Sequence, residues 1–353
     1  MHKERSREVT RPYRAVMIRK SLLASGIAGV SLATVAATVA VADDGHRPAA
    51  PAAAPASAAA SAWQKVGDGM TGGVSGLAVA RAGHDRVDTV VARDNKEAGQ
   101  VRLSAVRLSA GHAPVVRDLK WTGSEVPKDL ESLDAVPGRP GEYTTLSSGD
   151  GGKFRPTVYG VKVSGGTAAV RWSAPLPETE HYKGDGTQNY EAFAVHRDRA
   201  TGRDIAVWAT RGSNGTASQV RAAVLHPSAS SAEKVFSHVS DPVAFRAPWP
   251  AQDEVRHISD LKVAADGTVV LSSAQDPNKN SGPFSSAVYE AGRLTVDKGR
   301  PEVKLTAPKE VRRYTTADNR KIEAVALLPG GRALWGTDDE DFGGSLLLDR
   351  LDG

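Results

Sequence analysis

Acidic side chains recur through most of the chain, each at the start of a short apolar segment. Five such segments can be aligned so that the acids share one position, which is occupied in turn by Gly76, Glu131, Glu191, Asp260 and Glu323. Asp129 and Asn189 lie two residues before two of these acids, on the same side of an extended strand, because side chains alternate with a period of two. Carboxylates that converge repel one another unless a cation or positive side chains offset their charge.

Oxygen ligands without His or Cys are the donor set that calcium prefers. The pattern therefore predicts a calcium site built from Glu131, Glu191, Asp260, Glu323, Asp129 and Asn189. The alternative is structural: the same carboxylates accept hydrogen bonds from backbone amides in a wet channel and hold neighbouring repeats together. Recurrence shows that the acids share an environment, and it leaves both interpretations open.

Charged side chains follow the second strand of several repeats and form a candidate ligand-binding set, Lys96, Lys153, Arg155, Arg211, Asp338 and Asp339. The basic members would meet an anionic group such as a phosphate ester, with the metal bridging to it as a Lewis acid. The acidic run 338–341 is either a solvated loop or a second cation site. His181 is the one candidate for a general acid or base, with an ordinary surface histidine as the alternative.

The elements that would position these residues are short strands in a repeat of roughly sixty residues. The first strands are VSGLAVA (74–80), DLESLDAVPG (129–138), NYEAFAVHRD (189–198), ISDLKVAADG (258–267) and KIEAVALLPG (321–330). Each is followed by a turn and a second strand, and further strands complete the unit. About four antiparallel strands repeated around an axis form a propeller blade.

The sequence thus predicts an all-β protein, a β-propeller with five blades and with six as the alternative. The last unit ends after its third strand, SLLLDRL, and the segment 63–66 can supply the missing outer strand and close the ring. The 35 Gly and 20 Pro are typical of many short elements joined by turns. A β-sandwich is the other architecture that many short strands allow.

The N-terminal region predicts export. A basic segment precedes an uncharged apolar run that ends in Ala40-Val41-Ala42, a sequence that signal peptidase accepts. We expect a signal peptide over 1–42, with Met17 as an alternative start, a disordered Ala/Pro-rich linker over 43–62 and the propeller over 63–353. An uncleaved anchor is the alternative. The mature protein would be secreted, with a cell-envelope tether as a variant of that location.

Composition excludes several classes of function. The chain has no cysteine, so disulfides, thiolate zinc sites and a cysteine nucleophile are ruled out. Its net charge is +4 with scattered charges, which does not indicate a nucleic-acid partner. No Gly-x-Ser-x-Gly elbow, phosphate loop or His-Glu-x-x-His motif occurs. We expect a monomer without a membrane span in the mature form.

The segments DLESLDAVPGRPGEYTTLSS and KIEAVALLPGGRALWGTDDEDFGG resemble the Asp-x-Glu-Gly-hydrophobic-Ala blades of phytase-like and esterase-like propeller proteins. They are also similar to the wider group of calcium-centred propellers that includes gluconolactonases and paraoxonases. Glu131 and Glu323 match the acidic position of that motif. Ser132, Ala192 and Ala324 stand where a glycine is usual. The resemblance implies a propeller fold, calcium and hydrolase chemistry.

Two functions follow as hypotheses. In the first, a secreted propeller binds an extracellular small molecule, glycan or envelope component through its top face, with a cation in the central channel. In the second, a calcium-dependent hydrolase acts on phosphate esters, esters or lactones. Because the glycine and one acid of the motif are missing and no catalytic histidine matches it, the sequence favours binding.

Overall fold

The computed structural model describes residues 62–149, 155–177, 189–250 and 254–351. All of them belong to a compact unit, Ser57–Gly353. The predicted signal peptide and nearly all of the predicted linker lie outside the described residues. In the described ranges, no helix has the length and hydropathy needed to cross a bilayer.

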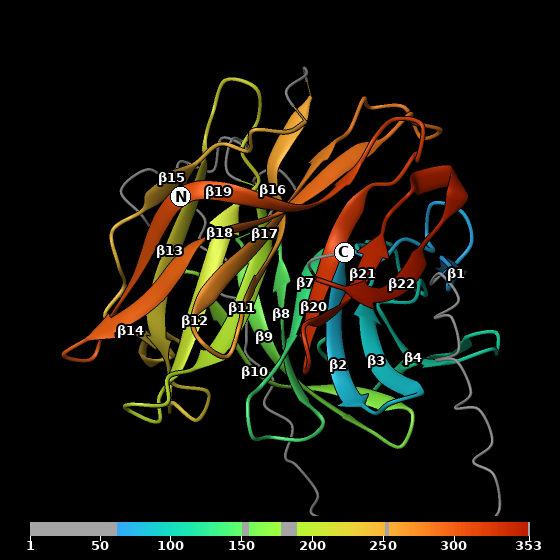
Figure 1. The fold of residues 1–353 in the computed structure, drawn as a ribbon. Coiled ribbons are helices and arrows are strands. Elements are labelled where there is room, and N and C mark those ends of the chain that lie inside the picture. The colour runs from blue at the N-terminus through green and yellow to red at the C-terminus, as the bar shows by residue number, and fades with distance from the viewer. Residues whose placement is uncertain (1–61, 150–154, 178–188, 251–253, 352–353) are drawn as a thin grey trace, which may run out of the picture. The chain divides into compact units, whose positions relative to one another are not determined.

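The described strands form five sheets, each a blade of a β-propeller (Figure 1). The first blade contains β2 (Gly76–Ala82), β3 (Arg86–Ala92), β4 (Leu103–Ser109) and β5 (Val115–Asp118). The second contains β7 (Leu130–Ala135), β8 (Glu142–Ser147), β9 (Thr157–Ser164) and β10 (Thr167–Pro175), with β6 (Lys120–Trp121) parallel to β10 at its edge. The third contains β11 (Tyr190–Arg197), β12 (Asp204–Thr210) and β13 (Ser218–Leu225), and both β14 (Phe236–Ser237) and β15 (Val243–Phe245) pair with β13.

The fourth blade contains β16 (Val255–Val263), β17 (Thr268–Gln275), β18 (Ser285–Asp297) and β19 (Arg300–Tyr314). The fifth contains β20 (Ile322–Leu328), β21 (Arg332–Thr337) and β22 (Ser345–Arg350). Its outer strand is β1 (Gln64–Lys65), antiparallel to β22. The predicted five blades and the predicted closure of the ring by the segment 63–66 are therefore confirmed. Short 3-10 turns occur at Ala232–Lys234 and Glu340–Phe342.

The first strands of the blades form a closed ring, because β2 packs against β7, β7 against β11, β11 against β16, β16 against β20, and β20 against β2. The apolar core is divided accordingly into five clusters, one between each pair of neighbouring blades. Strand β12 illustrates the rule. Its residues Ile205 and Val207 face the fourth blade, whereas Ala206 and Trp208 face the second. Strands covered on both faces are apolar at consecutive positions, which distinguishes them from strands with one wet face.

Candidate functional site

Three glutamates occupy the same structural position at the start of three first strands. In β7, β11 and β20 the pairing with the second strand skips one residue, and the residues skipped are Glu131, Glu191 and Glu323. Such a bulge turns the extra side chain away from the regular alternation of the strand. All three carboxyl groups are electrostatically coupled, since Glu191 and Glu323 both raise the pKa of Glu131. The three glutamates therefore converge at one end of the ring of first strands.

The bulge position differs from the sequence alignment in two blades. The backbone N–H of Ser75 donates to the Ala92 carbonyl, although Ala92 already pairs with Gly76, so Ser75 is the extra residue of β2. In β16 the regular pairing resumes at Asp260, so Ser259 is the residue at the bulge position. The alignment that placed Gly76 and Asp260 with the glutamates is thus wrong by one residue in these two blades.

Asp260 consequently has a different role from the glutamates. Its carboxylate accepts hydrogen bonds from the backbone N–H of Val325 in the fifth blade (2.7 Å), from the N–H of Leu261 (2.7 Å) and from Lys262 Nζ (3.2 Å). Burial raises the pKa of Asp260 to about 6, although Lys262 and the two amides act in the opposite direction. Asp134 binds the N–H of Val195 in the same way at 2.9 Å. These two aspartates connect neighbouring blades.

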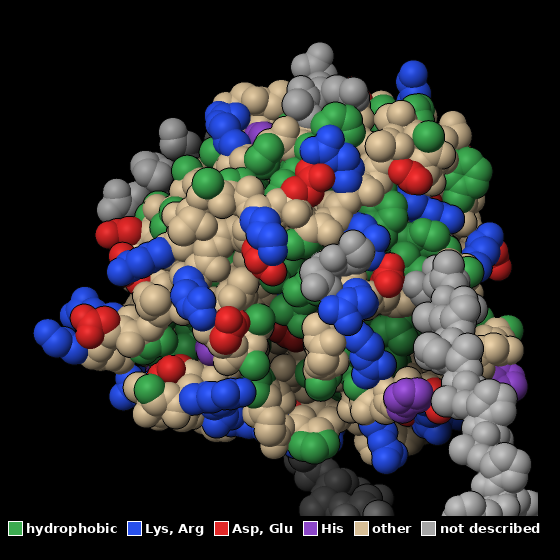
Figure 2. Space-filling model, in the orientation of Figure 1, with side chains coloured by type: hydrophobic (Ala, Val, Ile, Leu, Met, Phe, Trp, Pro, Cys, Tyr) green, Lys and Arg blue, Asp and Glu red, His purple; other side chains and the backbone are tan. Residues whose placement is uncertain are grey.

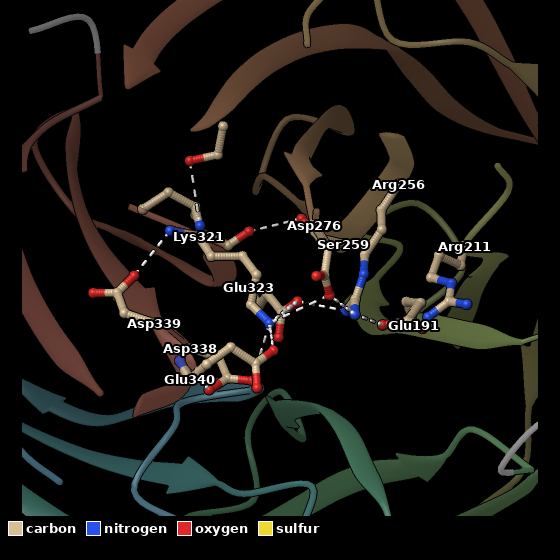
Figure 3. Close-up of polar contacts among 12 residues, drawn as sticks. Glu191, Arg211, Arg256, Ser259, Asp276, Lys321, Glu323, Asp338, Asp339 and Glu340 are labelled. Atoms are coloured by element: carbon tan, nitrogen blue, oxygen red, sulfur yellow. Dashed lines mark hydrogen bonds and ion pairs between the residues drawn. The ribbon is translucent and has the colours of Figure 1, made fainter. Parts of the chain in front are cut away.

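Arg256, the second residue of β16, is the counter-ion of the converging acids. Its Nη1 lies 2.6 Å from Glu323 Oε1 and 3.8 Å from Glu191 Oε2, and its Nη2 bonds to Asp276. One guanidinium thus joins carboxylates of the third, fourth and fifth blades (Figure 3). Burial alone would lower the pKa of Arg256, but the surrounding carboxylates raise it well above its usual value, so the side chain stays charged.

Lys321 is a second buried cation, and Glu323 lies between it and Arg256 (Figure 3). Its side chain is only 1% exposed, and its Nζ lies 3.5 Å from Glu323, 3.5 Å from Asp338 and 3.7 Å from Asp276. It also pairs with Glu340. Burial would lower the pKa of Lys321, but Glu323, Asp338 and Glu340 raise it above its usual value. We refer to Glu131, Glu191, Glu323, Asp276, Asp338, Glu340, Arg211, Arg256 and Lys321 as the axial cluster.

Glu131 differs from the other two glutamates because no cation of the described residues pairs with it. It is partly exposed, and it faces the carboxyl groups of Glu191, Asp129, Asp94 and Glu323. Burial first, and then these four acids, raise its pKa well above the usual range of a glutamate. Among the described residues, Glu131 thus has a raised pKa and no paired cation, and it lies beside Glu191, which contacts the guanidinium groups of Arg211 and Arg256.

A smaller group of charges adjoins Glu131 between the first and second blades. Lys96 Nζ lies 3.0 Å from the fully buried carboxylate of Asp129, which also accepts a hydrogen bond from Ser148. Burial and Asp338 raise the pKa of Asp94 to about 7, and Lys96 partly offsets that shift. The structure thus brings Lys96 to Asp129, and Asp129 close enough to Glu131 to raise its pKa.

Of the other predicted ligand-binding residues, some belong to the axial cluster and others lie outside it. Arg211 Nη1 lies 3.6 Å from Glu191 Oε1 and is 36% exposed, so it belongs to the axial cluster, as does Asp338. Asp339 is structural, because it accepts hydrogen bonds from the Lys321 N–H, Thr337 and Arg320. Arg155 is exposed just before β9. The backbone carbonyl of Asn189 accepts a hydrogen bond from the N–H of Arg211 at 2.7 Å. The candidates Lys153 and His181 lie outside the described residues.

The predicted calcium ligands do not form one set in the described ranges, where no group of three or more Asp, Glu, His or Cys side chains is arranged to hold a metal ion. Glu323 is held by Arg256 and Lys321, and Asp260 by the next blade. Positive side chains thus take the place that the sequence analysis gave to a cation. Calcium binding stays a prediction.

Sequence reasoning missed Arg256 and Lys321, whereas Glu340 lies in the acidic run that it had noted. Lys321 could have been found, because it directly precedes the apolar residue of the first strand, as Asp129 and Asn189 do in their blades. Arg256 has no such signal: it lies on the irregular start of β16, where the bulge breaks the strand period.

The similarity of this chain to known proteins is distant. No protein-family model matches the chain, and no curated protein sequence does. Among solved structures, a thermostable family-43 glycoside hydrolase is 12% identical with a TM-score of 0.48, over 82% of this chain and 92% of that one. An exo-β-1,3-galactanase from Phanerochaete chrysosporium with galactose is 10% identical with a TM-score of 0.48, over 83% and 64%. A glucose dehydrogenase is 12% identical with a TM-score of 0.40, over 81% and 98%. At these identities and TM-scores the likenesses carry no conclusion about function. The strand pairing of the described residues itself forms a five-bladed β-propeller.

Proposed function

We propose that this protein is an exported propeller that binds a polar small molecule or glycan at the axial cluster. The observation that carries the proposal is the convergence of Glu131, Glu191 and Glu323 from three blades around the guanidinium of Arg256. These groups offer both donors and acceptors at one end of the ring. Arg211 and Glu131 give a ligand access, because both are partly exposed.

The energetic cost of the cluster favours a binding role over a structural one. Bringing ionised groups into a protein interior costs several kcal/mol per ion, and apolar side chains of similar volume often stabilise as well or better. The five apolar clusters between blades already hold the ring together. The axial cluster is therefore not needed to hold the ring together, and charged groups of this kind are typical of sites that recognise a ligand.

The charge balance indicates which ligands suit the site. The axial cluster contains six carboxyl groups against the cations Arg211, Arg256 and Lys321. An excess of acids repels a phosphate ester and suits neutral hydroxyl groups or a cationic group. We therefore favour a saccharide or a cationic ligand over the phosphate esters that the sequence suggested.

Calorimetric titration with neutral mono- and disaccharides, amines and phosphate esters tests this function. Glu191→Gln is expected to weaken the binding of a saccharide or amine by about tenfold or more, because a charged hydrogen-bond partner contributes about 1.5–3 kcal/mol. Glu302→Gln, at an exposed position of β19, is the matched control and should bind as the wild type does. Equal binding by wild type and Glu191→Gln, or a preference for phosphate esters in the presence of a chelator, would refute the proposal.

Calcium is tested separately. The protein is treated with a chelator, and its melting temperature is measured with and without added calcium chloride. Calcium bound by the predicted ligands would give a concentration-dependent rise in melting temperature, because a ligand that binds only the native state stabilises it. An unchanged melting temperature would contradict the calcium prediction and leave the binding proposal intact.

A hydrolase is the second candidate, and the contrast between Glu131 and Glu191 favours it. Glu131 has a raised pKa and no paired cation among the described residues, whereas Glu191 contacts two guanidinium groups. General acid–base catalysis uses two carboxyl groups whose environments differ in this way. Chromogenic esters, lactones and glycosides are the substrates to assay. Turnover that is lost in Glu131→Gln and kept in Glu302→Gln would support catalysis. Absence of turnover on the whole panel would leave binding alone.

A further inference from the structure

A second charged hollow lies at the far end of the third blade. It has a volume of about 620 Å³ and is lined by the start of β12, the end of β13 and the turn that follows β13. Arg197, at the end of β11, lines it, whereas Glu191 lies six residues earlier on the same strand. At about 3.3 Å per residue, the two positions are about 20 Å apart. This hollow is therefore distinct from the axial cluster.

The lining of the hollow is strongly basic. Arg139, Arg197, Arg203 and Lys234 contribute positive charge, and Asp204 is the one carboxylate among its described lining residues. Asp204 is buried, with Arg197 Nε at 2.7 Å and Arg139 Nη2 at 3.8 Å. Two of the arginines are thus held in place around one acid.

Arg203 and Lys234 have no ion pair among the described residues, and both are exposed. Arg203 lies against the tip of the β18–β19 hairpin, since a methyl group on Gly299 would approach its guanidinium within 2.7 Å. Figure 2 shows Lys and Arg side chains, with some carboxylates between them, over the left side of the view, where this hairpin and β14 lie in Figure 1. Two unpaired cations facing a hollow favour an anion there.

An aromatic hollow of about 300 Å³ adjoins the basic one, since Arg139, Pro227 and Ser228 line both. Trp172 and Tyr143 line the second hollow. The indole of Trp172 lies over Gly160, where a methyl group would approach it within 2.0 Å, so Gly160 makes room for the ring. A partly exposed indole provides a flat apolar surface beside polar groups, the usual composition of a small-molecule site.

From this arrangement we propose that the two hollows form one binding site for a phosphorylated saccharide. Its phosphate would lie between Arg203, Lys234 and Arg139, and its sugar ring against Trp172. Guanidinium groups bind phosphate oxygens in a bidentate manner, and ammonium groups bind them as point charges. The site is independent of the proposed function at the axial cluster, and neither site requires the other.

Calorimetric titration at low ionic strength with glucose 6-phosphate, inorganic phosphate and glucose tests the proposal. Glucose 6-phosphate is expected to bind most tightly and glucose most weakly. The double variant Arg203→Gln/Lys234→Gln should lose at least about tenfold in affinity for both anions, and the dependence of affinity on salt should become weaker. Arg81→Gln/Lys120→Gln removes the same charge from exposed positions of the first and second blades and should bind as the wild type does.

Trp172→Phe distinguishes a sugar phosphate from a phosphate ion. It should weaken binding of glucose 6-phosphate and leave inorganic phosphate unaffected, and the quenching of tryptophan fluorescence by glucose 6-phosphate should disappear. Absence of anion binding, or equal losses in the two double variants, would overturn the site. Equal affinity for both anions with no effect of Trp172→Phe would overturn its assignment to a saccharide.

Discussion

Individual charged residues have two distinct roles in this propeller. Asp260 and Asp134 join neighbouring blades, because both oxygens of each carboxylate accept backbone N–H groups. The bulge residue Glu191 instead contacts the guanidinium groups of Arg211 and Arg256, and the bulge residue Glu131 faces other carboxyl groups. The difference arises from one residue of register, because adjacent side chains of a strand point to opposite sides.

Asp260 is expected to make stability depend on pH. Its pKa is raised from 3.8 to about 6 in the folded protein, so the native state binds more protons than the unfolded state between these values, and stability falls as the pH rises through them. At 1.36 kcal/mol per pKa unit, the loss is about 3 kcal/mol. Urea unfolding of wild type and Asp260→Asn from pH 4 to 7 measures it. The advantage of the wild type over the variant should shrink as pH rises, and a constant difference would contradict the prediction.

Arg256 is expected to be the most sensitive residue of the axial cluster. Arg256→Gln leaves Glu323 and Asp276 without their closest counter-ion, and breaking a buried pair costs about 3–5 kcal/mol. Urea unfolding measures the loss. Arg81→Gln, which removes a charge from an exposed site, should change stability by less than about 0.5 kcal/mol. A similar small effect of both substitutions would show that Glu323 is neutral in the folded protein.

At the scale of elements, the sequence predicts the strands well and their fine register less well. The apolar clusters of each repeat predicted first strands, five blades and the closing segment, because a strand covered on both faces is apolar along its length. The register failed at Gly76 and Asp260, since the alignment followed the acids. If the five first strands are instead aligned on the pattern apolar-x-small-apolar, Ser75 and Ser259 fall at the bulge position, and Gly76 falls at the position of Ala192. The role of Arg256 could not be predicted, because its three carboxylate partners come from different blades and are brought together only by the closed ring.

Gly76 is expected to be required for the contact between β2 and β7. A methyl group there would lie 2.5 Å from the carbonyl carbon of Ser132 and 2.6 Å from the Leu133 nitrogen, both backbone atoms. Gly76→Ala should therefore destabilise by about 1–3 kcal/mol through overpacking. Gly215→Ala is the matched control, since no atom lies within 4 Å of its added methyl group, and it should be neutral or slightly stabilising. Thermal unfolding of both variants measures the difference, and equal melting temperatures would contradict it.

At the scale of the whole described unit, the five interfaces between blades form a ring, so the ring is stable only if the first and last blades are joined. Strand β1 makes this connection. The Val66 N–H donates to the Gly344 carbonyl at 2.9 Å, and its buried side chain packs in the cluster between the fifth and first blades. Trp63 adds an edge-on contact with Tyr314, with ring centroids 5.6 Å apart. Closure thus depends on a few residues that are distant in sequence from the rest of their blade.

Val66→Pro should therefore open the ring at this junction. Proline removes the N–H that pairs with Gly344, whereas Val66→Ala keeps it and loses only two methyl groups. The proline variant should be less stable than the alanine variant by about 0.5–1.5 kcal/mol, the net contribution of one hydrogen bond, because the Gly67 N–H at 3.2 Å still donates to the Gly344 carbonyl. Urea unfolding gives this difference, and amide exchange should accelerate in β22 and β2 before it does in β12. Uniform acceleration across all five blades would instead mean that the ring unfolds as one unit whichever junction is weakened.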